Sequence, residues 1–172
     1  MNIKAIDTKY KNRLFRSRLE ARWAVFFDVL GIEWDYEPEG YQLPSGKYLP
    51  DFFLSEVHYD VFVEVKAGQF TQEEITKCDE LSAMTGKDVA MVSGMPAAIG
   101  YPAKMRQGDG DNNLEILFWR ATGHRDNSGK WVWPSNSEVE SIAADPIYQD
   151  AVLKAASARF EHGETGIPNR LK

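Results

Sequence analysis

The chain has 172 residues, of which 43% are hydrophobic and 27% charged, and this composition predicts one compact domain with a sizeable core. No apolar run reaches the length of a membrane span, and the N-terminal segment is too polar for a signal peptide. A single cysteine, Cys78, excludes an internal disulfide framework and a cysteine-based zinc site. We therefore expect a protein of the reducing cytoplasm.

Charge is spread unevenly along the chain. The net charge of −6 argues against a general nucleic-acid coat protein, yet residues 1–22 hold seven Lys or Arg against two acids. That segment carries +5, so the remainder carries −11. A basic strip on an acidic body suits a phosphate backbone. A solvated basic N-terminus is the alternative interpretation.

The first predicted element is a helix in the segment SRLEARWAVFFDVLG, residues 17–31. Ser17 and, three positions later, Glu20 fit a capping box, and Gly31 supplies the stop. Five large apolar residues follow the helical period and form one stripe. They are Leu19, Trp23, Phe26, Phe27 and Leu30.

Three strand-like segments, a second helix and a further strand come next. The extended segments cover residues 32–43, broken at 38–40, then 47–54 and 60–66, with a turn at 44–46 between the first two. Residues 71–85 predict a helix that ends at Gly86. The apolar run at 88–93 predicts a short buried strand. The resulting order is α-β-β-β-α-β.

The pattern weakens after Gly94. Residues 96–113 form a Gly- and Pro-rich connection that is too long for a simple loop, so we expect a functional or mobile segment there. The segments at 114–122 and 130–133 predict a hairpin around residues 124–129.

Asp145 and Pro146 open a final predicted helix over residues 147–160, as N-cap and first helical residue. Its apolar residues either cover the sheet or form a dimer contact. They are Val152, Leu153, Ala156 and Phe160. The tail beyond this helix is expected to be loose.

The third strand-like segment carries the first functional pattern. Val61, Val63 and Val65 share one face of this strand, so Glu64 and Lys66 share the other. An exposed Glu–Lys pair contributes little to stability. The alternative is that the two side chains form half of an active site.

The neighbouring strand supplies a second carboxylate, Asp51, which follows a proline at position 50. Proline cannot donate to a strand ladder, so it marks a strand start, an edge or a bulge. A tight hairpin would place Asp51 opposite or diagonal to Glu64, where like charges repel. A divalent cation between them would turn that repulsion into binding. Mg²⁺ fits, because it prefers one or two carboxylates with water and phosphate oxygens.

Glu20 is the third candidate carboxylate. It has a structural role as the N3 residue of the capping box. It also flanks the apolar stripe on the helical wheel, so it lies at the border where the helix meets the sheet. A glutamate there can point into a cleft between helix and strands.

Taken in order, SRLEARWAVFF, LPDFFL and VFVEVK resemble the PD-(D/E)XK nuclease superfamily over roughly residues 15–93. The longer pattern is similar to small phage and prophage members, and the ordering is similar to the endonuclease subunit of heteromeric transposases. The resemblance implies a restriction-endonuclease-like α/β core, a central mixed sheet flanked by helices, followed by a C-terminal hairpin and helix. It predicts a single domain over residues 1–172, with the core at 15–93, an elaboration at 94–162 and a loose tail at 163–172.

The resemblance also implies roles for individual residues. Asp51 and Glu64 would ligate Mg²⁺, for which Mn²⁺ could substitute, and the Val65 carbonyl would be a further ligand. Glu20 would bind through water or hold a second metal. Lys66 would orient or deprotonate the attacking water.

Contacts to nucleic acid are expected from the basic segment. Arg13, Arg16 and Arg18 precede or open the first helix and could hold phosphates, against the alternative of a solvated face. Gln69 follows the signature lysine and could assist.

The sequence thus predicts Mg²⁺-dependent hydrolysis of DNA by an endonuclease, with an exonuclease or junction-cleaving enzyme kept as variants. The alternative from another class is a phage-encoded module on the same fold that binds DNA, a phage or host protein, or a second copy of itself, with little or no cleavage.

Overall fold

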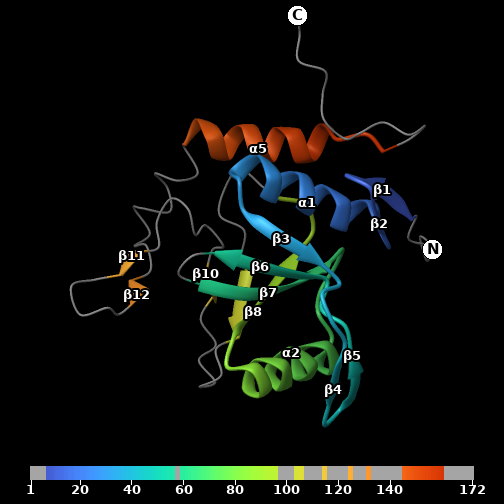
Figure 1. The fold of residues 1–172 in the computed structure, drawn as a ribbon, viewed down its shortest axis with the longest axis vertical. Helices are drawn as coiled ribbons and strands as arrows, with labels where there is room; N and C mark the ends of the chain where they lie inside the picture. The colour runs from blue at the N-terminus through green and yellow to red at the C-terminus, as the bar shows by residue number, and fades with distance from the viewer. Residues whose placement is uncertain are drawn as a thin grey trace, which may run out of the picture.

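A six-stranded mixed sheet lies at the centre of the molecule, in the order β10-β9-β8-β7-β6-β3 (Figure 1). The computed structural model describes residues 7–56, 59–96, 103–106, 114–115, 124–125, 131–132 and 145–160. The strands are β3 (Glu33–Tyr36), β6 (Phe52–Glu56), β7 (Tyr59–Lys66), β8 (Asp88–Ser93), β9 (Ala103–Arg106) and β10 (Leu114–Glu115). β7 and β8 run parallel, and the other neighbouring pairs run antiparallel. The mixed α/β architecture is therefore as predicted.

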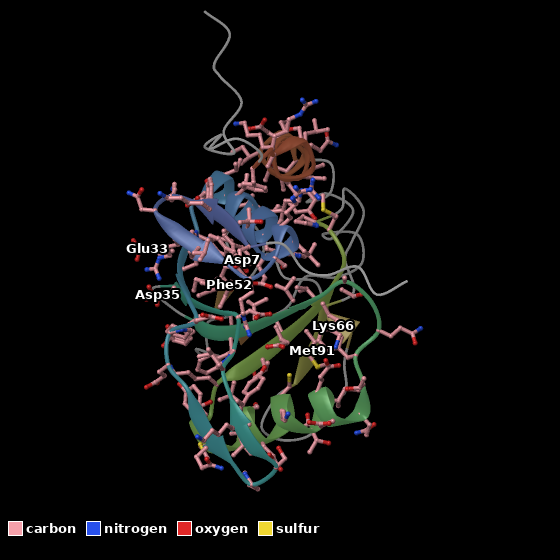
Figure 2. The ribbon with its side chains drawn as sticks, turned by 90° about the vertical axis from the view of Figure 1, so that its right-hand side faces the viewer. Asp7, Glu33, Asp35, Phe52, Lys66 and Met91 are labelled. Atoms are coloured by element: carbon pink, nitrogen blue, oxygen red, sulfur yellow. The ribbon has the colours of Figure 1, made fainter. Side chains whose placement is uncertain are left out.

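Within the described ranges, three helices surround this sheet in layers. α1 (Arg18–Leu30) covers one face, α2 (Gln72–Thr85) covers the other, and α5 (Pro146–Ser157) packs on the outer side of α1 (Figure 1). Phe52 points towards α1 and Met91 towards α2 (Figure 2). Successive residues of a strand point to opposite faces. The sheet therefore divides the apolar residues into two cores, one on each face.

Local chemistry explains why α1 begins and ends where the sequence predicted. The Ser17 hydroxyl accepts the backbone N–H of Glu20 at 3.2 Å, and Gly31 adopts a left-handed φ of 68° beyond the last turn. Phe27 packs against Phe52 of the sheet, and Phe26 packs against Tyr148 of α5. The helix is therefore buried on two sides, more than the single predicted stripe required.

The predicted strand at 47–54 is wrong, because the chain breaks there into two strands of different sheets. β5 (Gly46–Tyr48) pairs with β4 (Tyr41–Leu43) in a separate hairpin beside α2, and β6 starts only at Phe52 (Figure 1). The break contains Pro50, which has no N–H for a ladder. The predicted segment at 32–43 divides into β3 and β4 around its predicted break at 38–40, and residues 44–45 of the predicted turn close the hairpin.

An N-terminal hairpin was missed. β1 (Thr8–Tyr10) pairs with β2 (Arg13–Phe15) through a turn in which Lys11 and Asn12 have positive φ angles. Phe15 is fully buried in the α1-side core. Three-residue strands with charged outer positions carry almost no periodic pattern, which is why the sequence did not reveal them.

The C-terminal helix begins at Asp145 and Pro146 as predicted, but it does not cover the sheet directly. Its buried face, Tyr148, Ala151, Val152 and Ala155, lies against α1. Leu153 is 67% exposed and Ala156 is exposed, contrary to the predicted apolar face. No helix in the described ranges is long and apolar enough to cross a membrane.

The predicted pairing in the C-terminal elaboration is also wrong. β10 pairs with β9, which lies inside the segment expected to be a long connection. β11 (His124–Arg125) pairs with β12 (Trp131–Val132), so residues expected to form a turn belong to a strand. The predicted loose tail at 163–172 lies outside the described residues.

Candidate active site

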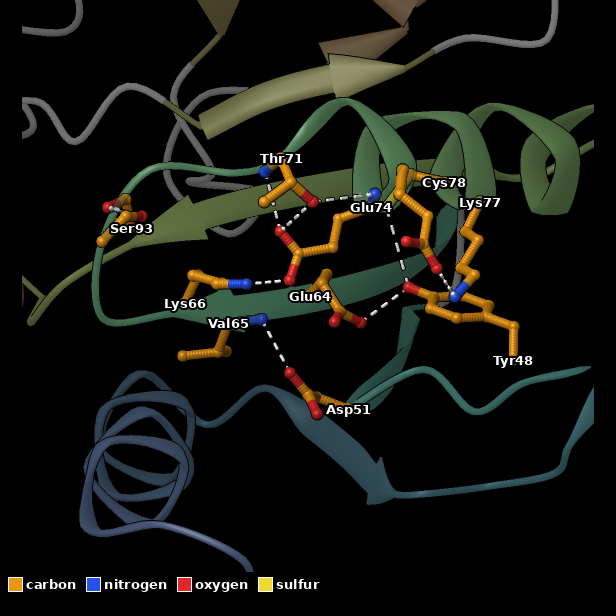
Figure 3. Close-up of polar contacts among 12 residues, drawn as sticks. Tyr48, Asp51, Glu64, Val65, Lys66, Thr71, Glu74, Lys77, Cys78 and Ser93 are labelled. Carbon is orange, nitrogen blue, oxygen red and sulfur yellow. Dashed lines mark hydrogen bonds and ion pairs between the residues drawn. The ribbon is translucent and has the colours of Figure 1, made fainter. Parts of the chain in front are cut away.

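The register between β6 and β7 brings two carboxylates together. Phe52 pairs with Val63 and Leu54 with Val61, so the same register continued by one residue places Asp51 opposite Glu64. The backbone N–H of Val65 donates to Asp51 Oδ2 at 2.8 Å, which ties Asp51 to β7 (Figure 3). This is the placement expected from the sequence, although Asp51 precedes β6 and is not inside a continuous strand.

Pro50 shapes the edge of β7 at this point. The register continued by two residues places Pro50 opposite Val65. The N–H and C=O of one strand residue point to the same edge, and the Val65 N–H points to Asp51. Proline has no N–H to donate to the Val65 carbonyl. The Val65 carbonyl is therefore directed at the edge where the two carboxylates meet.

Asp51 is 5% exposed, and each oxygen of its carboxylate accepts one hydrogen bond. Its Oδ2 accepts from Val65, and its Oδ1 accepts from Arg16 Nη2 at 2.8 Å. Burial raises the pKa of Asp51 well above its ordinary value, and repulsion from Glu64 and Glu20 adds to this. The Val65 amide and the Arg16 charge oppose the rise. The ionised carboxylate is thus disfavoured without a further positive charge.

Glu64 lies on the α2 side of β7 and is oriented by the separate hairpin. The Tyr48 hydroxyl of β5 donates to Glu64 Oε2 at 2.6 Å, and the same hydroxyl lies 3.6 Å from Cys78 Sγ of α2 (Figure 3). Burial raises the pKa of Glu64, and the Tyr48 hydrogen bond and the Arg16 charge partly offset the rise. Sequence reasoning missed Tyr48 as a partner, because only the three-dimensional hairpin brings it to β7.

Glu20 reaches the same region from the other layer, at the start of α1. It is 8% exposed, and its carboxylate accepts from the Ser17 hydroxyl at 2.6 Å and the Tyr36 hydroxyl at 2.5 Å. Its negative charge raises the pKa of both Asp51 and Glu64. The predicted capping position is confirmed. Glu20 also belongs to one electrostatic group with the two strand carboxylates.

Lys66 lies on the same face of β7 as Glu64 and forms an ion pair with Glu74 of α2 (Figure 3). The other Glu74 oxygen accepts from the backbone N–H and the hydroxyl of Thr71, at 2.7 and 2.9 Å. The capping box of α2 therefore fixes the acid that holds Lys66. The spacing of Thr71 and Glu74 signals such a cap, but it carries no information about the lysine.

The candidate phosphate-binding residues take different positions. Arg16 enters the centre, where it contacts Asp51 and, through Nε, Glu37 Oε1 at 2.6 Å. Arg13 pairs with Asp35 at 3.0 Å and lies over the Trp34 ring at the β3 edge. Of the other two predicted contact residues, Arg18 is half-buried at the start of α1, and Gln69 is exposed between β7 and α2.

The donor set fits a hard divalent cation. Within the described ranges, no three His, Cys, Asp or Glu side chains are already arranged as a complete metal cage. Mg²⁺ does not need one, because it binds through one or two carboxylates and retains several waters. Asp51 and Glu64 are two such carboxylates that face each other, and the pKa of each is raised by burial and by repulsion from neighbouring carboxylates. Their oxygens and the Val65 carbonyl are ligands that this cation prefers.

No protein-family model matches the sequence, and no curated protein matches it at a significant level.

Proposed function

We propose that this protein is a Mg²⁺-dependent nuclease of the PD-(D/E)XK type that hydrolyses phosphodiester bonds in DNA as an endonuclease. The observation that carries the proposal is the β6–β7 register, which sets buried Asp51 opposite Glu64. Lys66 extends from the same face two residues further along. Two carboxylates at one strand end can hold the cation of metal-assisted hydrolysis, and the ammonium beside them can stabilise negative charge in the transition state.

Each residue has a role that its contacts support. Asp51, Glu64 and the Val65 carbonyl would hold the cation, which supplies an acidified water and polarises the phosphoryl oxygen when bound. Glu20 adds negative charge from the α1 layer. Lys66, held by Glu74, is placed to orient the attacking water or to stabilise the negative charge of the transition state.

A binding module without cleavage is the second candidate. The ion pairs of the centre favour it, since Lys66 is neutralised by Glu74 and Asp51 by Arg16 within the chain itself. A centre of this kind would be structural, with the partner bound elsewhere. The net charge of −6 also favours a protein partner over DNA.

Cleavage assays separate the two candidates. Purified protein is incubated with supercoiled, linear, single-stranded and branched DNA, with Mg²⁺ or Mn²⁺ and with EDTA. We expect metal-dependent cleavage that falls by at least about a hundredfold in Lys66→Ala, since removing one transition-state contact costs roughly that much. Glu73→Gln, which alters an exposed acid of the same region, is the matched control. Equal inactivity of folded wild type and Lys66→Ala on all four substrates would support the binding module.

A further inference from the structure

Arg16 joins the candidate centre from the segment that precedes α1. Its Nη2 donates to Asp51 Oδ1 at 2.8 Å, and its Nε forms an ion pair with Glu37 Oε1 at 2.6 Å. One guanidinium therefore bridges a buried carboxylate and a carboxylate at the rim. The N–H of Val65 that holds Asp51 Oδ2 belongs to the strand backbone, whereas Oδ1 is held by the side chain of Arg16, so a cation can gain Oδ1 by displacing that side chain.

We propose that Arg16 is a resident counter-ion of Asp51, which a divalent cation displaces when it binds to Asp51 and Glu64. The inference rests on the proposed function, because it assumes a cation site at these two carboxylates. Two cations that share one carboxylate oxygen repel each other at short range. Arg16 and the divalent cation therefore compete, and the apparent affinity for the cation is lower than the carboxylates alone would give.

The exposure of the two partners decides which of them moves. The Arg16 side chain is 55% exposed, whereas the Asp51 side chain is 6% exposed. The carboxylate is fixed by its surroundings and by Val65, but the guanidinium can rotate into water along an exposed stem. Displacement thus requires rotation of one surface side chain and no rearrangement of the sheet.

Glu37 keeps the displaced guanidinium near the centre. Its backbone has a φ of 48°, a conformation that non-glycine residues seldom adopt. Its N–H donates to the Asp51 carbonyl at 2.9 Å, so the backbone of this rim residue is fixed relative to Asp51. Arg16 can therefore leave Asp51 while it stays bound to Glu37. In that position its remaining donors are free for a substrate phosphate, which guanidinium groups bind in a bidentate manner.

Calorimetric titration of Mn²⁺ into the protein tests the competition without any cleavage. The proteins compared are wild type, Arg16→Gln, Lys11→Gln and Asp51→Asn. Glutamine keeps a donor for Asp51 but removes the charge. Lys11→Gln removes a charge from the same basic segment, where the lysine pairs with Asp28. Thermal unfolding verifies that each variant is folded, and Arg16→Lys replaces Arg16→Gln if the latter is not.

We expect Arg16→Gln to bind Mn²⁺ roughly tenfold more tightly than wild type. The reason is that one neighbouring positive charge changes the proton-binding equilibrium of a carboxyl group by about tenfold or more. Arg16→Lys, which keeps the charge without the planar fork, should fall between them. Lys11→Gln should differ less than twofold from wild type, and Asp51→Asn should not bind. Equal or weaker binding by folded Arg16→Gln overturns the competition while leaving the proposed nuclease intact. Absence of binding in wild type and Arg16→Gln alike overturns both.

Discussion

Asp51→Asn is expected to raise the melting temperature of the metal-free protein at neutral pH and to abolish cleavage. Burial and repulsion from Glu64 and Glu20 raise the pKa of Asp51 well above its ordinary value of 3.8. The ionised aspartate therefore destabilises the folded state at neutral pH. Asparagine carries no charge to desolvate, and its side-chain oxygen can still accept from Val65. The loss of a ligand should reduce cleavage by at least about a thousandfold.

The pH dependence of this effect has a definite sign. In wild type, the folded state binds the Asp51 proton more tightly than the unfolded state, so this residue's contribution to stability decreases as pH rises from 3.8 through the raised value. The stability advantage of Asp51→Asn should therefore be largest at neutral pH and should vanish in acid. Thermal unfolding in EDTA across this pH range measures it. Asp35→Asn, at an exposed aspartate, should change stability by less than about 0.5 kcal/mol. A lower melting temperature for Asp51→Asn than for wild type at neutral pH contradicts the expectation.

Phe52→Ala is expected to cause the largest loss of stability, about 3–5 kcal/mol in the free energy of unfolding. Phe52 is fully buried, and its ring packs against four other aromatic rings from β2, α1 and β3. Those rings belong to Phe15, Phe27, Trp34 and Tyr36. Truncation would leave a cavity at the junction of three elements, directly beside Asp51.

Urea denaturation measures this loss, with Leu153→Ala as the control at a 67% exposed position. The control should change the free energy of unfolding by less than about 0.5 kcal/mol. A loss below about 1 kcal/mol for Phe52→Ala would show that the aromatic cluster does not hold the β6 end in place.

The sequence predicted the elements whose ends are fixed by local chemistry. α1 has a serine cap and a glycine stop, α2 has a threonine cap and Gly86, and α5 has Asp145 followed by proline. β8 is a short buried apolar run, and β7 has valines at the alternate positions 61, 63 and 65. The opposition of Asp51 and Glu64 also followed from the sequence, because alternation and a short connection determine the register of a hairpin.

What the sequence did not reveal depends on contacts between distant segments. Residues 47–54 read as one extended run, but Pro50 interrupts the ladder and Tyr48 packs against the α2-side core, so β5 and β6 join different sheets. Glu74 holds Lys66, and Tyr48 holds Glu64. Each of these pairs joins two different elements, so the pattern within one strand does not indicate it. Arg16 was predicted to bind a phosphate group. Its contact with Asp51 joins residues 35 positions apart in the chain, so no local pattern indicates it.

The central claim is that the β6–β7 register makes a cation site of Asp51 and Glu64, and anomalous diffraction from Mn²⁺-soaked crystals tests it most directly. The account predicts an anomalous peak within about 2.5 Å of oxygens from both carboxylates, at the distances typical of hard cations. It also predicts that Arg16 has left Asp51 Oδ1 and that the peak is missing in Asp51→Asn crystals. Saturating Mn²⁺ with no peak between the two carboxylates, and with the Arg16–Asp51 contact intact, would contradict it.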